Sequence, residues 1–152
     1  MNYYSIILCL VLGLFSNHTE QIVSFNEAGV STSFKGQFVT VTIHFDILQG
    51  YHIQSESETL DDVIATEIVF EDSNSFEIIS YEFTSKHNET VILNEYTHNV
   101  ITSAFEVTVT IKLNEKVSAL NYELGGQLYY QACTDRQCLF PRTLNFEVPN
   151  IK

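Results

Sequence analysis

The sequence predicts an all-β protein, a β-sandwich of about seven or more short strands. In residues 38–47 every second residue is apolar, and residues 107–113 repeat this alternation. Alternation of this kind is typical of a strand that buries one face and leaves the other in water. No segment after the N-terminal region has a sustained helical period. The pattern therefore favours stacked sheets over a mixed or helical fold.

The other strands are predicted from runs rich in β-branched and aromatic residues. A polar Glu-Asp-Ser-Asn turn at 71–74 separates two of them. Gly125 and Gly126 suit a tight turn between strands, and the polar interval 85–94 is expected to be a loop. The complete set of predicted strands is 38–47, 63–70, 76–84, 100–113, 117–124, 127–132 and 143–148.

An unbroken apolar run occupies residues 6–15. It has the length of the apolar region of a secretory signal peptide and is shorter than the roughly 20 residues that a membrane-spanning helix needs. We predict a signal peptide over residues 1–17, with a short membrane anchor as the alternative, and one domain over residues 20–152. Cys9 would leave with the signal, and the exported domain would be periplasmic or secreted, where disulfides persist.

The chain is acidic, with a net charge of −12 and only seven Lys and Arg residues among 152. Nucleic-acid binding is not expected, because contacts to phosphates need a cationic face. The excess of negative charge is better suited to keeping an exported domain soluble. We expect a monomer.

Cys133 and Cys138 enclose the four residues Thr-Asp-Arg-Gln between the last two predicted strands. Residues that face each other across a hairpin are close enough for a disulfide. Such a ring either staples the turn or exchanges electrons with other proteins. A loop this short stabilises a fold by only about 2 kcal/mol, and we expect the ring to be exposed, as exchangeable disulfides are. Because the charges of Asp135 and Arg136 oppose each other, both readings stay open.

A metal site is a weaker reading of the cysteine pair. Zinc usually takes four ligands, and no histidine cluster accompanies the cysteines. His44, His52, His87 and His98 are scattered along the chain, and each is expected in a solvated strand or loop position. Neither a metal nor another cofactor is predicted.

Two segments resemble the N-terminal periplasmic domain of the DsbD thiol:disulfide interchange family. Residues 130–141 read Tyr-Gln-Ala-Cys-Thr-Asp-Arg-Gln-Cys-Leu-Phe-Pro. The family's redox hairpin has Tyr-Gln, a small residue and Cys, then a short polar loop, a second Cys, an aromatic residue and Pro. Residues 49–55, Gln-Gly-Tyr-His-Ile-Gln-Ser, followed by Leu60-Asp61, are similar to the family's Gly-Tyr/Trp-His-Ile segment. The resemblance covers residues 24–149.

The resemblance implies an immunoglobulin-like β-sandwich with the cysteine pair on a hairpin at one end. It also implies that Cys133 and Cys138 form a redox pair, with Cys138 forming the mixed disulfide with partners. The activity would be that of a protein-disulfide reductase that needs no cofactor beyond the pair. Tyr51 and His52 would hold or relay a proton. The supporting residues that match the two segments are Tyr51, His52, Tyr130, Asp135, Arg136, Phe140 and Pro141.

Three departures from the family pattern matter. Residues 86–90, Lys-His-Asn-Glu-Thr, lack the aromatic residue of the family's cap loop, so weaker shielding of the cysteines is expected. The cysteine spacing is one residue shorter than in some members. The sequence ends at Lys152, so both partners are expected in trans.

The expected function is therefore a relay of reducing equivalents. A thioredoxin-like protein or a membrane electron donor would reduce the Cys133/Cys138 pair, and the pair would reduce oxidised exported proteins. The alternative is a non-catalytic, immunoglobulin-like protein-binding module with a structural hairpin disulfide.

Overall fold

The computed structural model describes residues 21–58, 60–61, 63–85, 88–93, 95–114 and 123–149. This part of the chain is all-β, and it contains no helix that could cross a bilayer. The predicted signal peptide over residues 1–17 lies outside the described residues. The strands are β1 (Val23–Lys35), β2 (Phe38–Ile47), β3 (His52–Gln54), β4 (Glu67–Phe70), β5 (Phe76–Ser85), β6 (Asn88–Leu93), β7 (Tyr96–Ile101), β8 (Phe105–Leu113), β9 (Leu124–Tyr130), β10 (Ala132–Cys133) and β11 (Arg142–Val148).

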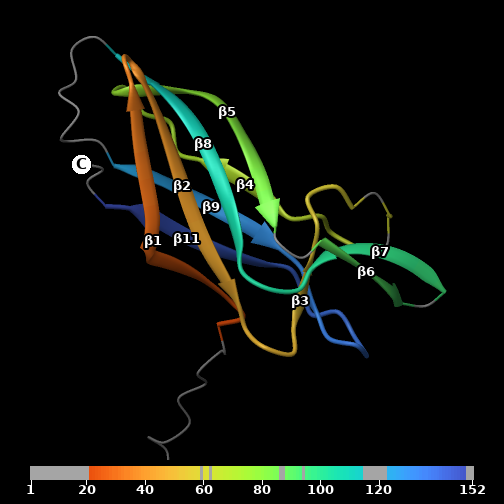
Figure 1. Cartoon of the computed structure of the whole chain (residues 1–152). Coiled ribbons are helices and arrows are strands. Elements are labelled where there is room, and N and C mark those ends of the chain that lie inside the picture. The colour runs from red at the N-terminus through yellow and green to blue at the C-terminus, as the bar shows by residue number, and fades with distance from the viewer. Residues whose placement is uncertain are drawn as a thin grey trace, which may run out of the picture.

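Two antiparallel sheets form the layers of a sandwich (Figure 1). One sheet has the strand order β1-β2-β8-β5, and the other has the order β11-β9-β4. The predicted immunoglobulin-like sandwich is confirmed.

The core lies between the two layers and is built from the alternating residues of the strands. In β2 the burial pattern alternates strictly from Val39 to Phe45, and β8 repeats it from Phe105 to Leu113. Phe45 is fully buried and stacks on Phe105, with ring centroids 5.2 Å apart. Its edge also meets Phe146 of the other sheet at 5.5 Å. Aromatic packing therefore joins the two layers at this level.

A third, smaller sheet with the order β10-β3-β7-β6 lies at one end of the sandwich. Figure 1 shows β6 and β7 projecting from that end, beside β3. β10 continues from β9 after Gln131 and pairs with β3. This small sheet thus places Cys133 at one end of the sandwich, on a hairpin, as the sequence predicts.

The structure corrects the prediction of a tight turn at Gly125 and Gly126, because both lie in β9. Strand β9 is central in its sheet, between β11 and β4. A Cβ atom on Gly126 would lie 2.6 Å from the Val69 carbonyl oxygen and 2.7 Å from the Phe146 ring. Glycine is needed here for close packing, not for a turn.

The prediction of a loop over residues 85–94 is also wrong, since β6 (Asn88–Leu93) pairs with β7. β6 is the outer strand of the small sheet, and its Glu89 and Thr90 are exposed. An edge strand with one face in water tolerates a polar sequence without clear alternation.

Other predicted boundaries are adjusted. The predicted strand 38–47 matches β2, while the predicted strand 100–113 divides into the end of β7 and all of β8. Most of the predicted strand 117–124 lies outside the described residues. β1 was not predicted, because its register against β2 shifts between Asn26 and Ser31 and interrupts the alternation.

Replacing Phe45 by alanine should lower the free energy of unfolding by about 3–5 kcal/mol, because the cavity would lie between both layers of the core. Phe38 on the same strand is 44% exposed and provides a matched control, for which Phe38→Ala should cause a much smaller loss. Urea denaturation followed by circular dichroism measures both. Equal losses in the two variants would contradict this description of the core.

Candidate functional site

Cys133 and Cys138 form a disulfide with their Cα atoms 3.9 Å apart. Backbone hydrogen bonds close the ring as a hairpin turn: the Thr134 N–H donates to the Gln137 carbonyl at 2.9 Å, and the Leu139 N–H donates to the Ala132 carbonyl at 2.8 Å. The Thr134 hydroxyl accepts the backbone N–H groups of Arg136 and Gln137. The ring is therefore held by its own turn as well as by the S–S bond.

The two cysteines differ in exposure, which corrects the prediction of an exposed ring. Cys133 is fully buried, whereas Cys138 is partly exposed. The difference follows from the strand pairing, since Cys133 faces His52 in the β10–β3 pair while Cys138 follows the turn. Cys138 is therefore the more accessible residue of the pair.

One face of the small sheet gathers polar side chains around Cys133. Residues that face each other across an antiparallel pair share a side of the sheet, and successive residues alternate sides. Ile53 and Ala132 point into the hydrophobic core. The opposite face carries Cys133, His52, Gln54 and His98.

Described residues between β3 and β4 form hydrogen bonds around this polar face. The Ile64 N–H donates to the Gln131 side-chain oxygen at 2.9 Å, and the Asn99 N–H donates to Glu58 Oε2 at 2.6 Å. The Thr66 hydroxyl donates to the Gln54 carbonyl. These bonds attach Glu58, Ile64 and Thr66 to residues in and beside the small sheet. Of the predicted cap region 86–90, residues 86–87 lie outside the described residues and the remainder begins β6.

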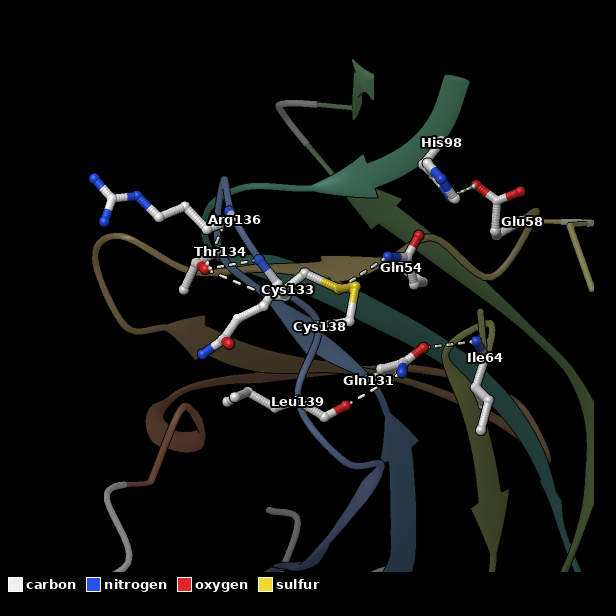
Figure 2. Close-up of a disulfide and its surroundings, with 11 residues drawn as sticks. Gln54, Glu58, Ile64, His98, Gln131, Cys133, Thr134, Arg136, Cys138 and Leu139 are labelled. Atoms are coloured by element: carbon white, nitrogen blue, oxygen red, sulfur yellow. Dashed lines mark hydrogen bonds and ion pairs between the residues drawn. A yellow bond between two sulfur atoms is a disulfide. The ribbon is translucent and has the colours of Figure 1, made fainter. Parts of the chain in front are cut away.

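Figure 2 shows three residues of this buried layer that sequence reasoning missed: Gln54, Glu58 and His98. The Gln54 side-chain N–H donates to the Cys133 sulfur at 3.2 Å. On the far side of Gln54, His98 Nδ1 lies 3.8 Å from Glu58 Oε2. Gln54 stands two residues after His52 in a segment already tied to the hairpin by resemblance, so its position was a usable signal. Glu58 and His98 had none.

His52 and His98 are buried, at 6% and 0% exposure, which corrects the prediction of solvated positions. His44 is partly exposed, 3.5 Å from Glu106, and His87 lies outside the described residues. Burial lowers the pKa of His52, Asp135 opposes this effect and His98 adds to it. His52 is therefore a neutral imidazole opposite Cys133 near neutral pH.

The other predicted supporting residues lie either in or against the hydrophobic core or on the surface. Tyr130 is buried in the hydrophobic core, and Tyr51 packs against that core. Asp135 and Arg136 are exposed in the ring, and the Arg136 side chain points away from the disulfide in Figure 2. Phe140 is 92% exposed, and the exposed Pro141 immediately precedes β11. Within the described residues, no group of three or more His, Cys, Asp or Glu side chains could hold a metal ion.

Comparison with solved structures finds domains of similar architecture. The N-terminal periplasmic domain of ScsB from Proteus mirabilis aligns with 80% of this chain at a TM-score of 0.54 and 12% identity, over 46% of the ScsB chain. The N-terminal domain of Neisseria meningitidis DsbD in the reduced form covers 80% of this chain and 84% of its own, at a TM-score of 0.43 and 16% identity. The GAE domain of yeast GGA1 covers 88% of this chain and 96% of its own, at a TM-score of 0.47 and 7% identity.

The ScsB alignment supports a shared fold, and the resemblance to DsbD-type N-terminal domains is confirmed at that level. This chain spans about half the length of the ScsB chain that it matches. No protein-family model matches the chain, and neither does any curated protein.

The buried His52 should make the oxidised protein less stable in mild acid. Its pKa in the folded state lies below the ordinary value of 6.5, so below that pH the unfolded chain binds a proton that the folded chain does not. The free energy of unfolding should therefore fall as the pH falls from 6.5 toward the folded pKa. Urea denaturation at several pH values should show a flatter profile in His52→Asn.

His44→Asn is the matched control for this experiment, because His44 is partly exposed and distant from Cys133 in the register of the sheets. Because His44→Asn keeps His52, its free energy of unfolding should fall in mild acid as that of the wild type does. Identical pH profiles for the wild type and His52→Asn would contradict a neutral His52.

Proposed function

We propose that this chain is an exported thiol–disulfide exchange module, with Cys133 and Cys138 as its redox pair. The observation that carries the proposal is the unequal exposure of the two cysteine residues: Cys138 is partly exposed, and Cys133 is buried against a hydrogen-bond donor. Exchange needs one sulfur that a partner can reach and a second that resolves or leaves. A sandwich with an extensive apolar core has little need of so short a staple.

In the reducing direction, the Cys138 thiolate attacks a disulfide of an oxidised exported protein. A mixed disulfide forms between Cys138 and the first target sulfur, and the second target sulfur leaves as a thiolate. Cys133 then loses its proton and attacks Cys138. The internal disulfide re-forms, and the first target sulfur is released. The target gains two electrons and two protons, and the cysteine pair loses the same number.

The pair is regenerated by a thioredoxin-like donor through the reverse chemistry. A donor thiolate attacks Cys138, and the bond between Cys138 and Cys133 breaks with the electron pair on Cys133. A second donor thiolate then attacks the donor sulfur of the mixed disulfide and releases Cys138. His52 and Asp135, beside Cys133 and in the ring respectively, are proposed to influence the accompanying proton transfers. Tyr51, Tyr130, Arg136, Phe140 and Pro141 would contribute by packing or by partner contact.

Periplasmic or secreted location is part of the proposal, with residues 1–17 as its signal. It is supported by the disulfide, which persists in oxidising compartments, and by the fold shared with a periplasmic domain.

The purified domain should show a reduction potential above about −300 mV in glutathione or dithiothreitol buffers, because exchanging disulfides lie higher than structural ones. A thioredoxin-like dithiol protein should also reduce it rapidly. A lower potential together with slow exchange would replace the proposal with the structural staple of a binding module.

The single-cysteine variants should differ in reactivity. In Cys133→Ser the remaining Cys138 should react with Ellman's reagent at least about tenfold faster than Cys133 does in Cys138→Ser, because reactivity requires access to the sulfur. Both variants should lose about 2 kcal/mol of stability with the ring. In denaturant the two rates should become equal. A faster reaction of Cys133 in the folded state would reverse the assigned roles.

A further inference from the structure

The Gln54 amide is fully buried beside the disulfide. Its nitrogen donates to the Cys133 sulfur at 3.2 Å. Its oxygen is buried and has no hydrogen-bond partner among the described residues. The amide nitrogen therefore has a hydrogen-bond acceptor, whereas the amide oxygen has no donor among the described residues.

Backbone contacts fix the strand from which the Gln54 side chain extends, and the side chain itself is fully buried. Gln54 pairs with Val100 of β7, and its N–H donates to the Gln131 carbonyl at 3.3 Å. Its own carbonyl accepts the Thr66 hydroxyl. With the strand held by three separate segments, the amide remains next to Cys133 while the unpaired oxygen stays buried, which is unfavourable.

Reduction of the disulfide changes what Cys133 offers to this amide. A disulfide sulfur is only a weak acceptor. A Cys133 thiolate is a stronger acceptor for the Gln54 N–H, which already faces the sulfur. A Cys133 thiol supplies an S–H donor, which the Gln54 oxygen accepts once the amide rotates to face the sulfur.

We propose that Gln54 is a positioning residue for the exchange reaction, which favours the reduced pair and selects Cys133 as the sulfur that leaves when Cys138 is attacked. The inference rests on the proposed function. When a donor thiolate attacks Cys138, the electron pair of the broken S–S bond moves to Cys133, where the Gln54 N–H is already in place. A leaving sulfur that is stabilised as a thiolate leaves faster.

Replacement by leucine tests this role, because Gln54→Leu keeps the approximate volume and removes both polar atoms. The equilibrium constant for reduction by dithiothreitol should fall about tenfold, which corresponds to about 30 mV for a two-electron couple. The rate of reduction by dithiothreitol should also fall. Gln54→Met, with a more flexible apolar side chain, should behave in the same way and serves if the leucine variant does not fold.

Gln127→Leu is the matched control. Gln127 lies in β9, where its side chain accepts the Tyr129 hydroxyl, and the variant should keep the wild-type equilibrium and rate. Unchanged values in both Gln54 variants, or an equilibrium shifted toward the reduced form, would overturn the inference.

The dithiothreitol equilibrium does not depend on a physiological partner, so it separates this inference from the proposed function. A wild-type potential below about −300 mV with slow exchange would remove the relay. Even then, a tenfold fall in the equilibrium constant for reduction in Gln54→Leu would support the inference that Gln54 favours the reduced pair.

Discussion

The pairing of β10 with β3 is the contact on which the rest of the site depends. It joins only two residue pairs, Ala132 with Ile53 and Cys133 with His52. One pair points into the core and anchors the small sheet to the sandwich, because Ile53 and Ala132 belong to the hydrophobic cluster. The alternation of a strand then directs Cys133 to the opposite side. The core pair thus decides on which side of the small sheet Cys133 lies.

A sulfur on that face would be exposed if the sheet stood alone. Three residues between β3 and β4 are hydrogen-bonded to its surroundings: Glu58 to Asn99, Ile64 to Gln131 and Thr66 to Gln54. The result is a compact polar layer in a region of low dielectric, where hydrogen bonds are stronger and unpaired polar atoms are more costly. Such a layer stabilises the fold less than apolar packing would. Its position beside the disulfide is the feature that the proposed exchange function would explain.

The fold itself does not distinguish a redox module from a binding module, since one sandwich architecture serves many activities. The distinction lies in the site, where a buried sulfur, a partly exposed sulfur and a buried amide occur together. A simple hairpin staple would not require a polar residue to be buried against one of its sulfurs. The asymmetry of the disulfide is therefore more informative about function than the architecture that carries it.

The sequence by itself determined the layers, because the alternation in residues 38–47 and 107–113 reports which face of each strand is buried. It also determined that Cys133 and Cys138 could join across a turn. Only the tertiary structure decided that Cys133 is buried, that β6 is a strand and that Gly126 lies under Phe146. β6 pairs with the neighbouring strand β7. The burial of Cys133 and the packing of Gly126 depend on contacts between segments distant in the chain, as does the meeting of Gln54 with Cys133, 79 residues apart. Local pattern carries no record of such contacts: the resemblance of residues 49–55 pointed to the segment that holds Gln54, but only the folded molecule shows its amide buried against the disulfide.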